Sequence, residues 1–222
     1  MKKAFTLTEL LIVIAIVGIS ISLLIPTINS AQQAGQCAQC KNNQRQLALA
    51  AVSYRNDYGM NPPAFTSSLK SWDDESILWQ YLDTGKKDLA CPEHIHSEFS
   101  KTGYNYNTSF IGNEGYMTGF IVRGVPNSEC AHPAKCAMFG DSSKNKFMRA
   151  PISDPMFDPY TDPATRCAGM QSFRHSGSTI VAWLDGHVSS QTAKFNTCND
   201  DPISGFLSED NSLYDPRKFK LD

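Results

Sequence analysis

The stretch MKKAFTLTELLIVIAIVGISISLLIPTI, residues 1–28, decides how this chain folds. No side chain from Leu10 to Ile28 is charged. The run is close to the ~20 apolar residues that a helix needs to cross a membrane. We therefore expect residues 5–28 to form a membrane-spanning helix.

Glu9 is the informative exception, because it is the only charged residue between Lys3 and Lys41. A charge inside a membrane costs about 2.5–3.5 kcal/mol unless it finds a partner. A cut between Ala4 and Phe5 would supply that partner, since the new α-amine of Phe5 could pair with Glu9 of a neighbouring copy. The first turn of a helix also favours negative charge through the helix dipole.

Two plainer interpretations compete with a cleaved filament-type leader. A secretory signal peptide also has a basic start and an apolar stretch, but here that stretch would open with an acid, and no clear small-residue cleavage site follows it. A plain membrane anchor leaves Glu9 unexplained. If the helix spans a membrane, Lys2 and Lys3 place the N-terminus in the cytoplasm and the rest of the chain outside it.

The segment from Lys3 to Leu11, KAFTLTELL, resembles the class III leader of type IV pilins and type II secretion pseudopilins. The resemblance implies that a prepilin peptidase removes residues 1–4 and methylates Phe5. Ala4 stands where glycine is usual, but it is still a small residue. Glu9 corresponds to the acid that pairs with an adjacent subunit. Pro26 corresponds to the position where pilin helices kink, and proline clashes with the preceding turn of any helix.

The same resemblance implies the partners and the location of the protein. The partners are prepilin peptidase, copies of the chain, other pilin-like subunits and an inner-membrane assembly platform. The chain would cross the inner membrane once, with its globular domain periplasmic or at the cell surface. We expect no cofactor and no metal. Scattered basic residues and a net charge of -2 argue against nucleic acid as a partner.

Beyond Pro26 the helix is expected to continue through residues 29–59 as an amphipathic second half. Seven residues recur at alternating spacings of three and four, which places them on one helix face: Cys37, Cys40, Gln44, Leu47, Ala51, Tyr54 and Tyr58. Gly59, followed closely by Pro62 and Pro63, provides the stop.

Residues 60–222 predict an extracytoplasmic globular domain, which gives the whole chain an α+β fold. The long helix should pack on a small antiparallel sheet with a loop-rich C-terminal region. A second helix is expected over residues 71–82, and strands over 103–107, 119–125, 135–139, 179–184 and 187–191. The polar tail after Pro202 should wrap the surface.

Seven cysteines are many for a domain outside the reducing cytoplasm, so most should form disulfides. The candidate bridges are Cys40–Cys91, Cys130–Cys136 and Cys167–Cys198, with Cys37 left free because the number is odd. Cys91, His94 and His96 also have a metal-like spacing, but no second ligand pair follows at zinc-finger distance. Asp141, Ser142 and Ser143 could offer oxygens to calcium, although they do not match the calcium loop of major pseudopilins.

The C-terminal motif runs from His175 through nine residues to Asp185-Gly186. Asp-Gly between two strand-like runs predicts a hairpin with a type I′ turn. The motif, together with Cys40, Cys91 and Arg174, resembles prepilin-type processing-associated proteins with the same His, nine residues, Asp-Gly signature. A catalytic triad of His175, Asp185 and a serine is the alternative, but no nucleophile elbow is present, and a structural hydrogen bond from His175 to a loop carbonyl is expected.

These patterns predict a pilin-like structural subunit that is cleaved, N-methylated and assembled into a type II secretion pseudopilus or a type IV pilus-like filament. It is not expected to be an enzyme. The alternative is a membrane-anchored extracytoplasmic enzyme or ligand-binding domain that uses a pilin-like anchor.

Overall fold

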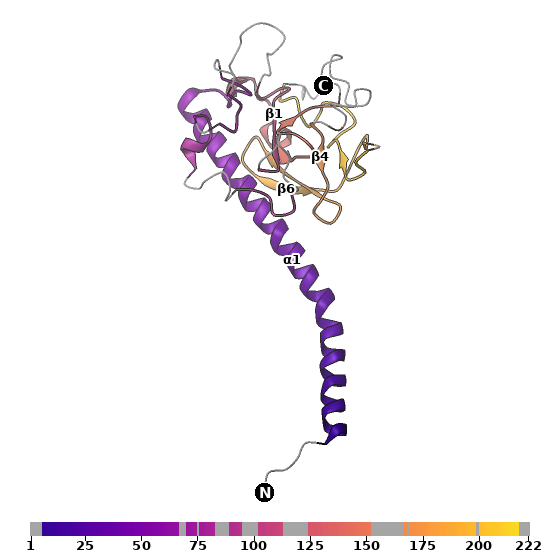
Figure 1. The fold of residues 1–222 in the computed structure, drawn as a ribbon. Helices are drawn as coiled ribbons and strands as arrows, with labels where there is room; N and C mark the ends of the chain where they lie inside the picture. Colours follow the sequence, from indigo (N-terminus) through magenta and orange to yellow (C-terminus); the bar gives the residue numbers. More distant parts are fainter. Residues whose placement is uncertain are drawn as a thin grey trace. The chain divides into compact units, whose positions relative to one another are not determined.

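The computed structural model describes residues 6–66, 70–74, 76–82, 89–94, 102–112, 124–151, 167, 169–198 and 200–217. A single α-helix within these ranges, α1 (Leu7–Tyr58), is 52 residues long. The chain divides into two compact units, Met1–Ala38 and Gln39–Asp222, so α1 begins in the first unit and ends in the second. Figure 1 shows α1 at the indigo end of the colour scale.

The globular unit contains a five-stranded sheet in the order β3-β1-β2-β5-β6. Its strands are β1 (Tyr104–Asn107), β2 (Ala137–Asp141), β3 (Phe147–Met148), β5 (Thr179–Trp183) and β6 (Val188–Gln191). A two-stranded sheet pairs β4 (Gln171–Ser172) with β7 (Ser204–Gly205). Three short 3-10 helices complete the described elements: η1 (Trp79–Tyr81), η2 (Asn127–Glu129) and η3 (Pro133–Lys135).

The five-stranded sheet is mixed, whereas the sequence predicts an antiparallel sheet. β1 pairs antiparallel with β2, but β1 and β3 run parallel. The loop 142–146 reverses the chain after β2 and carries it past β1, so that β3 pairs at the far edge of β1. The α+β class with a loop-rich C-terminal part is confirmed.

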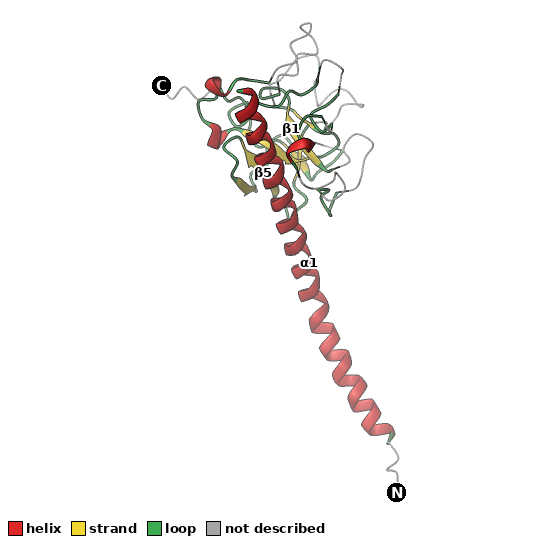
Figure 2. Ribbon diagram, turned by 90° about the vertical axis from the view of Figure 1, so that its left-hand side faces the viewer, coloured by secondary structure: helices red, strands yellow, loops and turns green. Residues whose placement is uncertain are grey.

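The inner face of the second half of α1 is buried in the globular unit. Cys40, Gln44, Leu47 and Ala51 are at most 1% exposed, which confirms the predicted face at these positions. The face ends before Tyr58, which is 54% exposed. Figure 2 shows α1 against the strands of the sheet, and a direct bond from Gln44 to the carbonyl of Ile180 in β5 joins them at 2.9 Å.

Both faces of the sheet are covered by apolar side chains. On one side Trp72, Tyr106 and Phe139 stack with ring centroids 5.0–5.7 Å apart. A second cluster includes Val181 and Trp183 of β5, which share one face of that strand as their alternation predicts. The other members are Ala137, Met148, Ala150, Cys167, Met170, Cys198, Phe206, Leu207 and Tyr214.

The helix predicted over residues 71–82 is wrong. The described residues of this range form turns and the single 3-10 turn η1. Tertiary contacts override the helical pattern, because Lys146 Nζ binds Ser71 and Asp73 at 2.6 and 2.8 Å, while the Trp72 indole donates to the Lys146 carbonyl at 2.8 Å.

Two other expectations need correction or lie outside the described ranges. The tail after Pro202 does not lie on the surface as a whole, because Phe206 and Tyr214 are fully buried and Ser204–Gly205 form β7. Of the strand expected over 119–125, residues 119–123 lie outside the described ranges, and Gly124 and Val125 are not in a strand.

Candidate functional site

The N-terminal end of α1 is closed by a capping box. The hydroxyl of Thr6 accepts a hydrogen bond from the Glu9 backbone N–H at 3.3 Å. In return, Glu9 Oε2 accepts bonds from the Thr6 backbone N–H at 2.9 Å and from the Thr6 hydroxyl at 2.8 Å. This reciprocal arrangement satisfies backbone N–H groups that a helix start leaves unpaired. Glu9 therefore has a local structural role.

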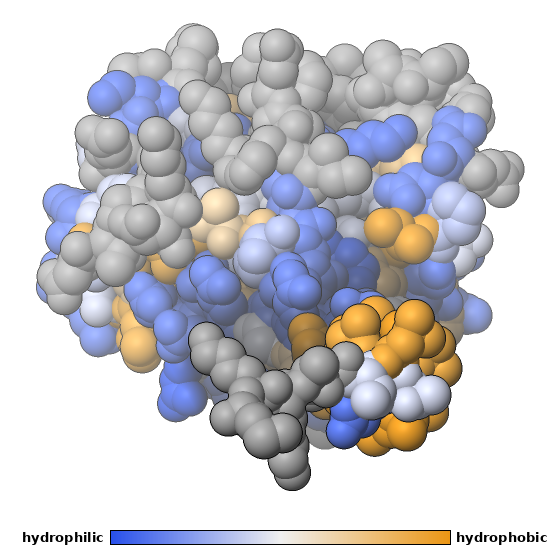
Figure 3. Space-filling view, turned by 60° about the horizontal axis from the view of Figure 1, so that its bottom comes forward, coloured by the Kyte–Doolittle hydropathy of each residue, from blue (hydrophilic) through white to orange (hydrophobic). Residues whose placement is uncertain are grey.

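The apolar side chains of the first unit are exposed. Every Leu, Ile and Val side chain from Leu7 to Ile28 keeps 48–78% of its surface exposed. Figure 3 shows an orange, hydrophobic group of this kind at its lower right. By length and hydropathy α1 is the one described helix that could cross a membrane.

The few hydroxyls in this apolar stretch are satisfied by the helix itself. Ser20, Ser22 and Thr27 donate to helix carbonyls three or four residues earlier at 2.7–2.8 Å. Such internal bonding is what a lipid environment requires, since lipid offers no partner for a polar group. α1 also continues through Pro26 without interruption. The expected kink there stays a prediction, and Ala4 and Phe5 lie outside the described residues.

A buried polar cluster joins four separate segments of the globular unit. Asp141, the last residue of β2, lies at its centre and is fully buried. Asp141 Oδ1 accepts bonds from Arg174 Nη2 at 2.9 Å and from Gln44 Nε2 at 3.2 Å. Its Oδ2 accepts the backbone N–H of Ile180 at 2.8 Å. The carboxylate thus ties α1, the sheet and the segment before β5 together.

A tight turn before β5 places Arg174 and His175 in this cluster. His175 and Ser178 exchange backbone bonds at 3.0 Å in both directions. The two residues between them, Ser176 and Gly177, have φ angles of +50° and +80°. Two successive positive φ angles are the mark of a type I′ turn. The type I′ geometry expected at Asp185-Gly186 is therefore found at the opposite end of the motif.

The His175 side chain contacts carboxylates, whereas the sequence predicts a hydrogen bond to a loop carbonyl. Its Nδ1 lies 3.1 Å from Glu93 Oε1, and its Nε2 lies 3.4 Å from Asp141 Oδ2. Burial opposes a charge on this imidazole, but hydrogen bonds to Asp141 and Cys91 and their negative charge raise the pKa of His175 to about 10. These contacts favour the imidazolium form of His175, which bridges two acids.

Two cysteines complete the cluster. Cys40 of α1 and Cys91 are free thiols in the structure and at most 2% exposed, and their sulfurs lie 2.6 Å apart. Arg174 Nε lies 3.3 Å from Cys91 Sγ, and His175 Nε2 lies 3.9 Å from it. Cys40, Cys91 and His175 are donors of the kind that bind zinc. However, two thiolates on one tetrahedral zinc stand about 3.8 Å apart at Zn–S bonds of about 2.3 Å, so this sulfur separation suits a bond between the sulfurs.

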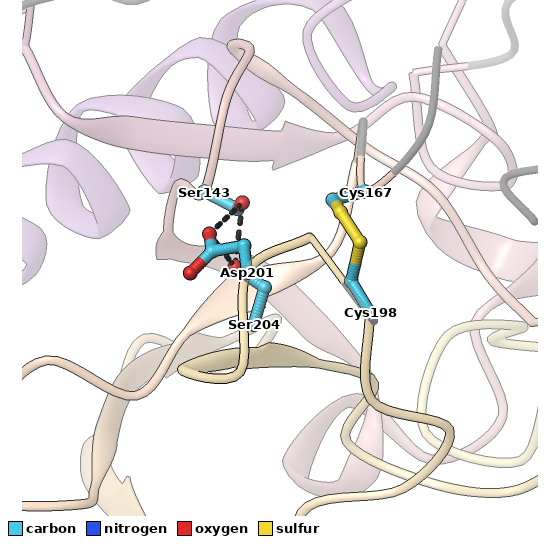
Figure 4. The surroundings of a disulfide bond; sticks show 5 residues. All are labelled: Ser143, Cys167, Cys198, Asp201 and Ser204. Carbon is cyan, nitrogen blue, oxygen red and sulfur yellow. Dashed lines mark hydrogen bonds between the residues drawn. A yellow bond between two sulfur atoms is a disulfide. The ribbon is translucent and has the colours of Figure 1, made fainter. Parts of the chain in front are cut away.

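The other cysteines follow the expected pairing only in part. Cys167 and Cys198 form a disulfide, beside which Asp201 Oδ2 accepts hydrogen bonds from the hydroxyls of Ser143 and Ser204 (Figure 4). Asp141 and Ser143 face different partners, so they do not converge on one calcium position.

Cys130 and Cys136 are separate free thiols, so their expected bridge is not formed. Cys136 is buried at the start of β2, with its thiol 3.2 Å from the Tyr214 carbonyl. Cys130 lies after η2, where its thiol is 3.6 Å from the Pro126 carbonyl. The zinc candidate His96 lies outside the described residues.

The hairpin from β5 to β6 forms with a different turn from the one expected. Gly186 N–H donates to the Trp183 carbonyl at 2.8 Å, and Trp183 N–H donates to the His187 carbonyl at 2.9 Å. Gly186 has a φ of +94°, whereas Asp185 is not among the residues with positive φ. This is a three-residue loop with a glycine bulge. Asp185 pairs with His187 Nδ1 at 2.6 Å and not with His175, so the imagined triad does not form.

Replacing Gly186 with valine should destabilise the globular unit by about 1–3 kcal/mol, because a β-branched residue at positive φ is strained. A steric clash is not the cause, since an added Cβ would meet only Val52 at 3.9 Å. Urea unfolding of the full chain in detergent measures the change. Gly186→Asn is the matched control, because asparagine tolerates this conformation better; equal losses for both variants would contradict the explanation.

The sequence pairs Cys40 with Cys91 as a candidate bridge, but it does not place His175 and Gln44 beside them. The sequence marks Asp141 only as a candidate calcium ligand and Arg174 only as part of a motif. It does not single out Glu93 as a functional residue. The useful clue was that Gln44, a polar residue, lies on the predicted buried helix face. A buried amide needs partners.

Comparison with known proteins places the recognisable part of the chain at its N-terminus. Residues 1–25 match the prokaryotic N-terminal methylation motif. No curated protein and no solved structure matches the chain. The match and the apolar helix fit a class III prepilin-like leader, and they support processing by prepilin peptidase and a single-pass membrane anchor as in pilins. The resemblance of the His175 to Gly186 motif stays an expectation.

Proposed function

We propose that this chain, whose N-terminus carries a prepilin-like methylation motif, is a structural subunit of a type II secretion pseudopilus or a type IV pilus-like filament. Prepilin peptidase cuts between Ala4 and Phe5 and methylates Phe5. The subunit then waits in the inner membrane with its N-terminus cytoplasmic and its globular unit outside. The observation that carries this proposal is the motif match at residues 1–25, on a helix whose apolar surface is uncovered.

The exposed apolar surface supports both stages of this role. Residues 7–28 rise about 33 Å at 1.5 Å per residue, close to the hydrocarbon thickness of a bilayer of about 30 Å. The same side chains can bury against other copies in a filament. Burying one Leu, Ile or Val side chain contributes about 1.5–3 kcal/mol. A repeated head-to-tail contact of this kind does not close on itself, so it makes fibres.

Glu9 is the second support, because its capping bonds leave part of it free. Among the described residues, the bonds that Glu9 accepts from Thr6 both use Oε2. Oε1 therefore stays open to an α-amine from a neighbouring copy. Capping its own helix and pairing with another subunit are compatible roles.

The enzyme alternative gains no support from the described residues. The polar groups that could do chemistry lie in the buried cluster, where Asp141 and the His175 side chain are fully buried and Arg174 is 7% exposed. His175 faces Asp141 and Glu93, whereas Asp185 faces His187. An interior network of this kind ties segments together.

Intact-mass analysis of membrane-extracted protein tests the proposal. The mature chain should lack Met1 to Ala4 and carry one extra methyl group, which fragmentation should locate on the amine of Phe5. Protein from cells without prepilin peptidase activity is the control and should keep its full length. A mature form that retains Lys2 and Lys3 in cells with active peptidase would refute the proposed processing.

A further inference from the structure

We propose that Cys91 is the attacking thiolate of a disulfide that closes with Cys40, and that Arg174 and His175 are positioning residues that hold this thiolate. The bond would fasten α1 to the segment 89–94 inside the globular unit. The inference does not depend on filament assembly, because it concerns chemistry within one chain.

The geometry first favours a bond between these two sulfurs. They lie 2.6 Å apart, although the residues are 51 positions apart in sequence. A disulfide bond is about 2.05 Å long, so a small movement closes it. Both sulfurs are buried against the cluster, and a domain outside the reducing cytoplasm favours oxidation.

The charges around the pair are unequal, and this asymmetry selects Cys91. Arg174 Nε points to Cys91 Sγ at 3.3 Å and the His175 imidazole lies 3.9 Å from it. The guanidinium is held in place because Nη1 donates to the Ser142 carbonyl at 2.9 Å and Nη2 to the Gly103 carbonyl at 2.7 Å. Arginine therefore presents Nε to the sulfur in a fixed direction.

The titratable and charged groups around Cys91 come from several of the described segments. They are Cys40 from α1, Tyr104 from β1, Asp141 from β2, Arg174 and His175 from the turn before β5, and Glu93 behind His175. The hydrogen bond from Cys40, followed by the hydrogen bond from His175 and the charge of Arg174, lowers the pKa of Cys91 against the effect of burial. The same contact and burial raise the pKa of Cys40. Of the two thiols, Cys91 is the one that faces Arg174 and His175, and it is therefore the thiolate.

The reaction is ordinary thiol–disulfide exchange with an oxidising disulfide, either a protein disulfide or oxidised glutathione. The Cys91 thiolate attacks one sulfur of the oxidant, a mixed disulfide forms, and the first oxidant thiolate leaves. Cys40 loses its proton and attacks the Cys91 sulfur, and the second oxidant thiolate leaves. The chain gives up two electrons, and the oxidant becomes a dithiol or two thiols. Because Cys40 on α1 lies against Cys91 in the closed unit, the mixed disulfide forms before α1 packs on the cluster, while Arg174 and His175 already lie beside the Cys91 sulfur.

The bond would lie where the helix joins the globular unit. That unit begins at Gln39, one residue before Cys40. A cross-link at this position prevents the second half of α1 from separating from its sheet. His175, the first residue of the C-terminal motif, and Arg174 before it thereby gain a role that the hairpin alone does not explain.

Reoxidation of the full chain in detergent tests the proposal. The protein is reduced under denaturing conditions, refolded with oxidised glutathione at pH 6, quenched with an alkylating reagent and mapped without reduction. We expect a linked Cys40–Cys91 peptide. The bond should form about tenfold more slowly in the double variant Arg174→Gln, His175→Gln. Each unit by which the pKa of Cys91 rises lowers its thiolate population about tenfold at this pH. Arg174→Lys should restore part of the rate.

The Cys167–Cys198 bond of the same molecules is the internal control, because Arg174 and His175 do not contact it. Its rate should change less than twofold in every variant that folds. A second measurement needs no change to the charged residues. The thiolate absorbance near 240 nm is followed against pH in Cys40→Ser and in the double variant Cys40→Ser, Cys91→Ser, and the difference between the two reports Cys91. Serine keeps a donor at position 40, so the Cys91 step should appear below pH 7.

Three results would overturn the proposal. They are a Cys91 titration at or above the ordinary value of about 8.5, equal slowing of both disulfides in folded variants, and stoichiometric zinc on protein whose Cys40 and Cys91 remain unlinked. Failure here would leave the N-terminal processing of Phe5 untouched, so the two proposals are judged separately.

Discussion

Cells that carry Glu9→Gln should assemble at least about tenfold fewer filaments than wild-type cells, although the subunit is made and folded. A partner charge left unpaired at membrane depth costs about 2.5–3.5 kcal/mol, and each 1.4 kcal/mol corresponds to tenfold. Glutamine can still serve in a capping box, so this variant removes the charge while it keeps the helix start. Filaments sheared from cells are quantified against membrane-bound subunit.

Thr6→Val is the matched control for Glu9→Gln. It removes the hydroxyl that donates to Glu9 Oε2 at 2.8 Å and accepts the Glu9 N–H, but it leaves the carboxylate charge in place. If pairing with a neighbouring α-amine drives incorporation, Thr6→Val should assemble near wild-type levels. Normal assembly by Glu9→Gln together with failure of Thr6→Val would show that helix capping is the only role of Glu9.

The elements that sequence reasoning predicted well are those set by local periodicity. The α1 face through Gln44 and Leu47 and the strand around Val181 follow from apolar repeats of 3.6 and 2. Each lies within one continuous segment, so no knowledge of distant partners was needed. The hairpin was found for the same reason, but its turn type depends on Asp185, whose backbone keeps a negative φ because Gly186 alone absorbs the reversal.

The failures share a dependence on distant contacts. The helix expected near Trp72 is replaced by turns because Lys146, more than seventy positions away, binds that segment. β3 pairs in parallel with β1 because of a chain reversal that no local pattern encodes. The tail was judged polar, yet Tyr214 reaches the core and binds Gln171 at 2.9 Å.

The buried cluster was beyond sequence reasoning for a related reason. Gln44 meets Asp141 across 97 positions and the Ile180 carbonyl across 136. Neither separation leaves a trace in spacing. Two local signs of a buried partner exist: a polar Gln44 on an otherwise apolar helix face, and a charged Asp141 at the end of the apolar strand β2.

Asp141→Ala should therefore be the most destabilising single substitution in the globular unit, at about 3–5 kcal/mol. Removing one member of a buried ion pair leaves the other charge without compensation, and Arg174 is only 7% exposed. The backbone N–H of Ile180 and the amide of Gln44 lose acceptors at the same time. Urea unfolding of the full chain in detergent, followed by tryptophan fluorescence, measures the loss.

Asp185→Ala is the control, because Asp185 also pairs with a basic residue, His187, but the two side chains are 34% and 48% exposed. An exposed pair contributes about 1 kcal/mol at most. A third variant separates lost charge compensation from lost packing: Arg174→Met added to Asp141→Ala should recover part of the stability, since replacing both charges removes the uncompensated one. If Asp141→Ala costs no more than Asp185→Ala, the cluster does not hold α1 and the sheet together.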